Sequence, residues 1–280
     1  MTTTHPHPVT GEPFASPVPA GRGWPDDPFV PDLTGPPATT AADVADRARV
    51  GTLVSVGSEV SVCRACPRLV EWRERVAVEK RASFAGQPYW GRPVAGWGDD
   101  EPRVLVVGLA PAAHGGNRTG RIFTGDRSGD WLFASLHRVG LATQATSEHA
   151  GDGQRLIGTR MAAAVRCAPP DNKPTVVERD TCAPWLHREV ALVAPHVRAV
   201  VALGSYGWDA ALRALRAAGY AVPRPKPRFG HGAEVAIGEH LTLLGCYHPS
   251  QQNTFTGRLT EAMLDDVLGR AAGLAGRMSP

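Results

Sequence analysis

The chain has 280 residues, of which 42% are hydrophobic and 20% are charged, and its formal net charge is +3. These values describe a globular protein with a substantial core, and the mild positive charge is compatible with nucleic acid without indicating it. No apolar run reaches the ~18 residues of a membrane span, and the first residues lack the apolar core of a signal peptide. We therefore expect a cytoplasmic protein without membrane contact, whose five cysteines are thiols or metal ligands.

The chain begins with a segment rich in proline. Residues 1–38 hold ten of the 25 prolines, with Thr, Gly and Ser between them, so little of this segment can pack. We predict a disordered tail over 1–38 and one folded domain over 39–280. The first helix is expected directly after Thr40, which can cap it together with Asp43.

Four apolar runs follow and predict buried strands. Each is continuous rather than alternating, which is typical of strands buried on both faces of a parallel sheet. Helical patterns separate the runs, and this alternation predicts one α/β domain, a three-layer sandwich whose central parallel sheet is flanked by helices. The four predicted strands are residues 103–109, 160–167, 198–204 and 241–247.

The helical patterns between these runs carry their own start and stop signals. Ser128 and Ser205 are the expected N-caps of two helices, and Gly219 is the expected end of the second. Pro184 lies inside a third helical pattern and predicts a kink or a break there.

The cysteines form a pattern of their own. Cys63 and Cys66 are three residues apart before the first strand, Cys167 ends the second strand, and Cys182 follows in the next helix. In a reducing compartment, four cysteines from two segments favour a thiolate site, either a structural zinc or a 4Fe–4S cluster. The alternative is that Cys167 and Cys182 are small buried hydrophobes. Cys246 lies within an apolar run and is expected in the core.

Polar and aromatic side chains follow the predicted strands. Because ligands bind at the carboxyl ends of strands in open parallel sheets, these residues are the candidate site. After the first strand, Gly108 opens a stretch of small residues that leads to His114, Phe123 and Asp126. The Gly-Lys-Ser/Thr ending of a phosphate-binding loop is absent, which argues against a nucleoside triphosphate.

The loops after the second and fourth strands complete this candidate site. Asn172 lies in "CAPPDNKP" and His248 in "GCYHPSQQN". Phe123 can stack on a flat heterocycle, Asn172 can read its hydrogen-bonding edge, and His248 can meet a developing anion. Asp126 can meet positive charge or orient water. This combination suits a nucleobase turned out of a DNA helix.

These stretches resemble a known family. "GLAPAAHGGNRTGRIFTGD", "VRCAPPDNKP" and "HPSQQNTFTGRLT", with the cysteine spacing, are similar over residues 60–272 to the uracil-DNA glycosylase superfamily, and closely to its type-B, family 5 iron–sulfur branch. The resemblance implies a four-stranded parallel sheet flanked by helices, hydrolysis of the N-glycosidic bond of uracil in DNA, and a 4Fe–4S cluster on Cys63, Cys66, Cys167 and Cys182. The cluster would act as a structural clip.

The resemblance also implies roles for single residues. Ala110 stands where many members have an acid or amide that handles water, so Asp126 is the candidate replacement, with a helix cap as its alternative role. His248 would donate to the uracil oxygen as negative charge develops. Phe123 would stack on the base, with burial in the core as the alternative.

Further residues of these loops carry substrate-binding roles by the same resemblance. Ser250 would bind phosphate, and Asn253, with Gln251 and Gln252, falls where the family inserts a side chain into the duplex. Gly108, Ala110, His114 and Asn172 complete the predicted substrate-binding set. The alanines at positions 110 and 163 predict a less exclusive pocket, open to hypoxanthine and ethenocytosine.

A basic segment offers a DNA contact outside the pocket. Residues 213–228 hold five cations and no acid, and they track phosphates unless they form an ordinary solvated linker. Tyr89 and Trp90 are expected to cover the core. We expect a monomer that binds single- or double-stranded DNA, and the rival interpretation is a non-catalytic DNA-binding module with a structural zinc held by four cysteines.

Overall fold

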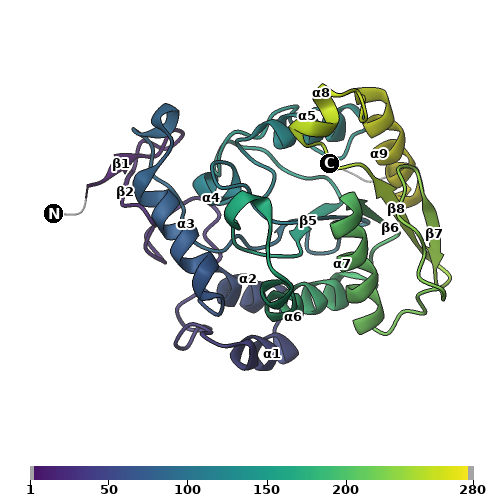
Figure 1. The fold of residues 1–280 in the computed structure, drawn as a ribbon, viewed down its shortest axis with the longest axis horizontal. Helices are drawn as coiled ribbons and strands as arrows, with labels where there is room; N and C mark the ends of the chain where they lie inside the picture. Colours follow the sequence, from purple (N-terminus) through teal and green to yellow (C-terminus); the bar gives the residue numbers. More distant parts are fainter. Residues whose placement is uncertain (1–2, 277–280) are drawn as a thin grey trace.

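The computed structural model describes residues 3–276 and arranges them in three layers (Figure 1). The sheet lies in the middle, with α5 and α9 on one face and α6 and α7 on the other, and α1 and α2 pack against α6. This is the predicted α/β sandwich. These helices span Ala41–Val50 (α1), Leu53–Val62 (α2), Arg127–Arg138 (α5), Val176–Val193 (α6), Gly204–Ala217 (α7) and Glu261–Ala275 (α9).

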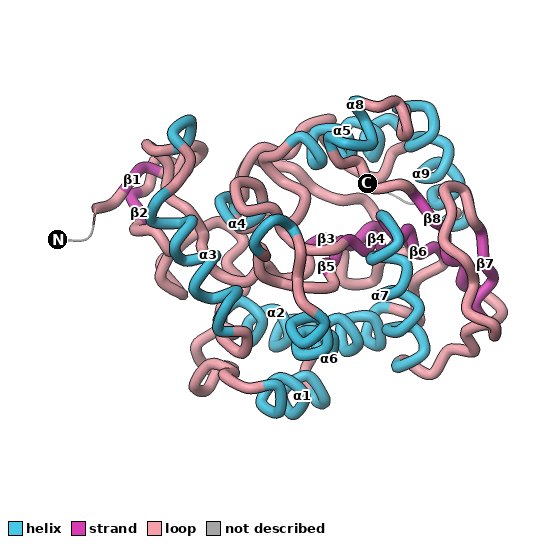
Figure 2. The backbone as a smooth tube through the Cα atoms, in the orientation of Figure 1, coloured by secondary structure: helices cyan, strands magenta, loops and turns pink. Residues whose placement is uncertain are grey.

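The central sheet has six strands in the order β3-β5-β4-β6-β8-β7 (Figure 2). The four predicted strands are its parallel centre, and the two additional strands pair antiparallel at the edges. Sequence patterning missed the edges because β3 is two residues long and β7 is partly exposed rather than continuously apolar. The strands are Trp97–Gly98 (β3), Val104–Gly108 (β4), Thr159–Ala163 (β5), Ala199–Leu203 (β6), Glu234–Ile237 (β7) and Leu241–Cys246 (β8).

Both faces of the parallel strands are buried, which explains their continuous apolar runs. In β4, Val104 and Val106 face α5 and α9, whereas Leu105 and Val107 face α6 and α7. Successive side chains of a strand point to opposite faces, so a central strand needs apolar residues at every position. Because β4, β5, β6 and β8 are parallel, their carboxyl ends meet at one edge of the sheet.

The remaining helices lie in the connections. Most of them belong to the loops that follow β4, β5 and β8 at the edge just described. They are α3 (Pro67–Glu79), η1 (Ala82–Phe84), α4 (Gly116–Thr119), η2 (Pro170–Asn172) and α8 (Gln251–Phe255).

Two predicted caps are wrong by a few residues, and the break at Pro184 does not occur. The N-cap of α5 is Asp126, whose side chain accepts from the Gly129 N–H, instead of Ser128. Ser205 lies inside the first turn of α7 instead of capping it. Helix α6 continues through Pro184. The predicted capping box of Thr40 with Asp43 is present at α1.

The N-terminal segment differs from the predicted disordered tail. From residue 3 to 38 it runs across the surface, and it forms a two-stranded ribbon of β1 (His5–Pro6) and β2 (Pro13–Phe14) at the left of Figure 1. Phe14, Val18 and Trp24 are buried in the same apolar cluster as β4. These few large apolar residues, spaced between prolines, order a segment whose average composition suggests disorder.

This segment is also held by polar contacts. Asp27 forms a two-pronged ion pair with the Arg92 guanidinium at 2.8 and 3.1 Å, and both side chains are buried. The Trp24 indole donates to the Thr119 carbonyl. Among residues 3–276, no helix is long and apolar enough to cross a membrane.

Candidate active site

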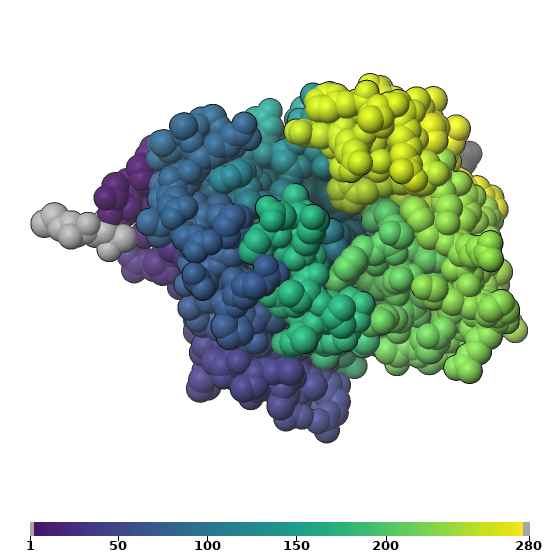
Figure 3. Space-filling model, viewed as in Figure 1, coloured from purple at the N-terminus to yellow at the C-terminus, as the bar shows by residue number. Residues whose placement is uncertain are grey.

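A pocket of about 530 Å³ opens at the carboxyl edge of the sheet, and we call it the strand-end pocket. Figure 3 shows a hollow on this face between the yellow C-terminal segment and the teal and green middle of the chain. Its size is in the range of ligand-binding pockets. It is lined by Leu109, Ala110, Ala112, Phe123, Asp126, Arg127, Ser128, Asn172, His248, Ser250, Gln251 and Gln252.

The aromatic wall of this pocket is Phe123. Its ring is only 6% exposed, and its backbone has a φ of +52°, a conformation that is unusual for a bulky residue. The ring packs directly on Gly108 at the end of β4, where an added Cβ would lie 2.4 Å from the ring. A glycine is therefore needed at position 108 so that the Phe123 ring can pack on the backbone, and Gly108 does not itself line the pocket.

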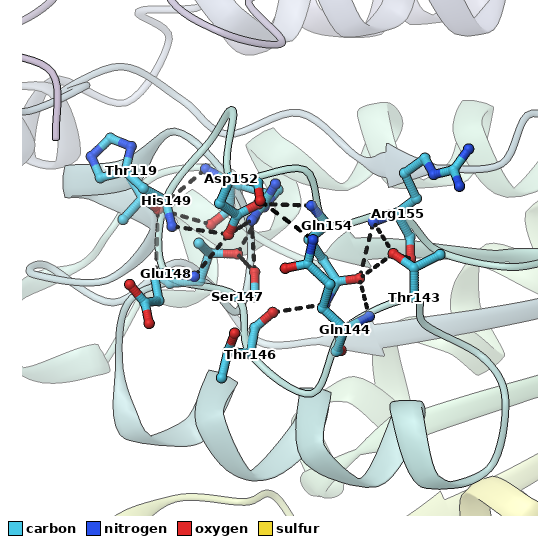
Figure 4. A network of polar contacts seen from close by, with 12 residues as sticks. Thr119, Thr143, Gln144, Thr146, Ser147, Glu148, His149, Asp152, Gln154 and Arg155 are labelled. Atoms are coloured by element: carbon cyan, nitrogen blue, oxygen red, sulfur yellow. Dashed lines mark hydrogen bonds and ion pairs between the residues drawn. The ribbon is translucent and has the colours of Figure 1, made fainter. Parts of the chain in front are cut away.

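A polar network fixes the residues on either side of Phe123. Arg121, two residues before it, donates to Asp152 at 2.6 Å and to Ser147 at 2.9 Å. Thr124, directly after it, shares a hydrogen bond of 2.7 Å with Ser147. Figure 4 shows Ser147 and Asp152 in the middle of this network. Contacts on both sides of Phe123 thus offset the cost of its backbone geometry.

His248 follows β8 and forms the opposite wall. Its ring centroid lies 6.2 Å from that of Phe123, with an angle of 41° between the planes. Burial alone lowers the pKa of His248 to about 4. The imidazole is therefore neutral at physiological pH and has one N–H to donate.

Asp126 is the one carboxylate among the described residues that line the pocket. One of its oxygens accepts from the Gly129 N–H at 3.0 Å and caps α5. The other lies against Gly115, where an added Cβ would be 2.0 Å away. Burial raises the pKa of Asp126, with the Gly129 N–H opposing the shift. Both roles considered for Asp126, a helix cap and a carboxylate facing the pocket, are thus compatible with one position.

Asn172 and Ala110 complete the pocket. Asn172 ends η2, and both it and Asp171 have positive φ values, +56° and +53°. Asn and Asp tolerate this conformation better than other side chains, so the loop is locally favoured by its sequence. Asn172 is exposed and stands at the rim, whereas Ala110 leaves open the space an acid would occupy.

The loop after His248 contributes its first residues to the pocket. Ser250 is the N-cap position of α8 and lines the pocket with Gln251 and Gln252. Asn253 does not line it, because its amide donates to the His248 carbonyl at 2.8 Å and fastens the loop. Sequence reasoning missed Arg127, whose guanidinium lies 4.2 Å from the ring of the exposed Phe255. The signal for Arg127 was its position directly after Asp126.

His114 lies outside the strand-end pocket. Its Nδ1 is 3.0 Å from the Tyr89 hydroxyl, and it lines a neighbouring hollow of about 450 Å³, which we call the side hollow. Burial and the nearby Arg81 and Arg118 lower the pKa of His114. Tyr89 and Trp90 are buried, as predicted.

The four predicted ligand cysteines share one small cavity, the cysteine cavity. Cys63, Cys66, Cys167 and Cys182 all line it, together with apolar residues such as Leu69. Burial raises the pKa of three of these thiols, Cys63, Cys66 and Cys182. Within residues 3–276, no group of three or more His, Cys, Asp or Glu is placed to hold a single metal ion.

Hydrogen-bond donors surround these thiols. The Arg73 guanidinium donates to the Cys167 sulfur at 2.9 Å, and the backbone N–H of Arg166 donates to the Cys182 sulfur at 3.3 Å. Side-chain N–H groups of Arg73 and Arg166 are buried without a partner in the described part of the chain. Such orphaned donors are uncommon, and they fit an anionic group with acceptor atoms.

The basic segment is partly neutralised. Arg213 pairs with Asp180 and Lys226 with Asp209, whereas Arg216, Arg224 and Arg228 are exposed. Its contact with phosphates stays a prediction. Cys246 is fully buried in the core cluster, as predicted, and it does not line the cysteine cavity.

The mycobacterial relatives cover almost the whole chain. A protein of Mycobacterium bovis named Type-5 uracil-DNA glycosylase is 58% identical over 270 residues, which is 96% of this chain and 99% of that protein. The match therefore includes most of the N-terminal segment, so the prediction that the likeness begins near residue 60 is wrong for this relative. A protein of the same name from Mycobacterium leprae is 58% identical over 81% of this chain and 97% of its own length.

More distant relatives carry the same name. A Type-5 uracil-DNA glycosylase of Thermus thermophilus is 50% identical over 217 residues, which is 78% of this chain and 95% of that protein. The profile described as Uracil DNA glycosylase superfamily matches residues 95–271, the part that contains the strand-end pocket. The chain belongs to the uracil-DNA glycosylase superfamily and to its type-5 branch.

Proposed function

We propose that this protein removes uracil from DNA by hydrolysing the N-glycosidic bond and leaves an abasic site. One observation carries the proposal: loops from three strands bring Phe123, Asp126, Asn172 and His248 to the wall of one pocket. The relatives named Type-5 uracil-DNA glycosylase support the same reaction.

Binding of the base follows from the walls of the pocket. The Phe123 ring offers an apolar face to a base that has left the helix, and such stacking is worth about 1–3 kcal/mol per base. The Asn172 amide at the rim has a donor and an acceptor for the edge of the base. Gly108 lets the Phe123 ring pack directly on the end of β4, and the position of this ring sets how deeply the base can enter the pocket.

Bond cleavage develops charge of both signs. The leaving uracil becomes an anion, and the N–H of the neutral His248 imidazole donates to its oxygen more strongly as that charge grows. The sugar gains positive character, which the Asp126 carboxylate stabilises while it orients the attacking water. Ala110 supplies neither function, so these tasks fall to Asp126 in this chain.

The cysteine cavity is proposed to hold a 4Fe–4S cluster on Cys63, Cys66, Cys167 and Cys182. Four thiols, an apolar enclosure and unpartnered buried donors fit such a group. A single zinc on the same four cysteines is the alternative, and iron and sulfide analysis of the purified protein distinguishes the two. When bound, the cluster would supply cross-links between α3, α6 and the loop that leads to Asn172.

The experiment is to incubate the purified protein with an oligonucleotide that contains one uracil, as a single strand and as a duplex. Free uracil and an alkali-labile strand are the expected products. Identical oligonucleotides with thymine in place of uracil serve as the control. Stoichiometric DNA binding without any released base would support the non-catalytic module instead.

The finer proposals concern the range of substrates and the setting. Ala110 and the open rim favour acceptance of hypoxanthine and ethenocytosine, and oligonucleotides with these bases test it under the same conditions. Strict preference for uracil would reject that range. Buried thiols suit a reducing cytoplasm, where the protein would act as a monomer on DNA.

A further inference from the structure

The side hollow is continuous with the strand-end pocket but has a different character. Ala112, Asp126, Arg127, Asn172 and Gln251 line both spaces. A group held in the strand-end pocket is therefore a direct neighbour of whatever occupies the side hollow. The proposed function places the uracil in the strand-end pocket and assigns no part of the DNA to the side hollow.

The walls of the side hollow combine aromatic rings with positive charge. Trp72 and Phe84 line it, and each is only partly buried. Arg81 and Arg127 line it from two sides, both exposed and neither in an ion pair with another of residues 3–276. Arginine side chains also lie over the two rings, Arg75 over Trp72 and Arg118 over Phe84. Rings beside guanidinium groups without carboxylate partners are the combination that holds single-stranded nucleic acid.

An unsatisfied donor marks the same wall. The Trp72 indole N–H is buried and has no hydrogen-bond partner in the described residues. A buried donor without an acceptor costs about 1–3 kcal/mol, so it is usually found where an acceptor arrives. The carboxylates of Asp171 and Asp126 also line the hollow, which disfavours a free anion and favours a ligand that presents a base as well as a phosphate.

We propose that the side hollow binds the nucleotide next to the excised one in the same DNA strand. Its base stacks on the Trp72 ring, its sugar-phosphate backbone accepts the indole hydrogen bond, and its phosphate lies between Arg81 and Arg127. This inference rests on the proposed function, because the target base must occupy the strand-end pocket. It makes the enzyme a reader of a two-nucleotide unit rather than of a single base.

The test measures binding by a His248→Ala protein, whose slowed release of uracil leaves the oligonucleotide intact during a short binding measurement. Single strands carry uracil with an abasic spacer in place of the base on its 5′ side or its 3′ side. We expect one of the two spacers to weaken binding about tenfold, the size of one lost stacked base. In a Trp72→Ala background, the same spacer is expected to weaken binding less than twofold.

Two further variants keep the test decisive if Trp72→Ala folds poorly. Trp72→Phe retains the ring and loses the donor, and we expect it to remain sensitive to the spacer. Arg81→Gln is expected to weaken binding several-fold and to reduce its salt dependence. Arg103→Gln, an exposed arginine at the opposite end of β4, is the matched control and is expected to change neither.

Equal binding of all spacer strands would overturn the inference, and so would an equal spacer penalty in the Trp72→Ala and parent backgrounds. Failure of the proposed function is a separate result: the unmodified protein would release no uracil from the intact strand. Release that is normal, combined with no spacer effect, rejects the side hollow alone.

Discussion

The strand-end pocket and the cysteine cavity lie at the two ends of one segment, residues 167–172, yet their walls differ in kind. The pocket is wide and lined by an imidazole, a carboxylate and an amide, whereas the cavity is small and lined by thiols and apolar side chains. An open polar pocket admits a substrate from solvent, whereas a closed apolar cavity suits a group that remains permanently bound. The difference supports the proposed division, with the chemistry in the pocket and a structural role for the cavity.

A chain of contacts links the two regions. Arg73 donates to the sulfur of Cys167 and to the carbonyl of Cys63, and it is 1% exposed. Its own carbonyl accepts from the Asn117 amide in the loop that leads to Phe123. The cavity therefore supports both the first loop of the pocket and the approach to Asn172.

The largest expected effect is on the cavity. If the proposed 4Fe–4S cluster occupies it, Cys167→Ser should abolish most of the iron and sulfide in the purified protein, because such a cluster needs four thiolates. Cys246→Ser is the matched control, a buried cysteine outside the cavity, and should keep them. Iron and sulfide analysis of the purified proteins checks this. Equal contents in the two variants would reject Cys167 as a ligand of the cluster.

The second effect separates chemistry from folding in the pocket. His248→Ala should slow single-turnover release of uracil about a hundredfold or more, the cost of one donor to a developing anion, about 3 kcal/mol. The thermal midpoint is measured for each variant, so that a loss of rate is compared between folded proteins. His137→Ala changes an exposed histidine and is the control. If His248→Ala released uracil at a rate within twofold of this control, a residue other than His248 would donate to the uracil anion.

A smaller effect distinguishes the two roles of Asp126. Asp126→Asn keeps an oxygen that can cap α5, whereas Asp126→Ala removes it at a cost of about 1 kcal/mol. Both should slow uracil release about tenfold or more, yet only the alanine variant should lose stability. Release rates and thermal midpoints are measured together. Full activity of the asparagine variant would leave the carboxylate as a cap alone.

The smallest effect concerns the link through Arg73. Arg73→Gln should speed loss of the cluster under oxidation by about tenfold, in line with removal of a supporting hydrogen bond. Arg73→Lys retains a positive donor and should lie between the two. Decay of the visible absorbance reports the rate of cluster loss. Identical decay in the parent protein, Arg73→Gln and Arg73→Lys would show that Arg73 does not support the cluster, and the proposed link through it would fail.

The parts of the molecule that could be predicted from sequence are those with short-range causes. Continuous apolar runs identified the parallel strands, and the small and polar residues after them placed Phe123, Asp126 and His248 in one pocket. His114 and Asn253 could not be placed, because hydrogen bonds to Tyr89 and to a carbonyl decide their positions.

The N-terminal segment was beyond such reasoning for a different cause. Its order depends on long-range partners: Trp24 needs the carbonyl of Thr119, and Asp27 needs the guanidinium of Arg92. Composition averages over those few residues and therefore suggests disorder. Contacts between residues distant in sequence leave no local pattern.

The protonation state of His248 is the most direct test of this account. The pKa of about 4, against an ordinary value of 6.5, makes the imidazole neutral throughout pH 5 to 8. Single-turnover release of uracil should therefore show no step near pH 6.5 that depends on His248, and a fall toward acid that persists without His248 belongs to Asp126, whose pKa burial raises. A step centred near pH 6.5 that disappears in His248→Gln would contradict the neutral imidazole.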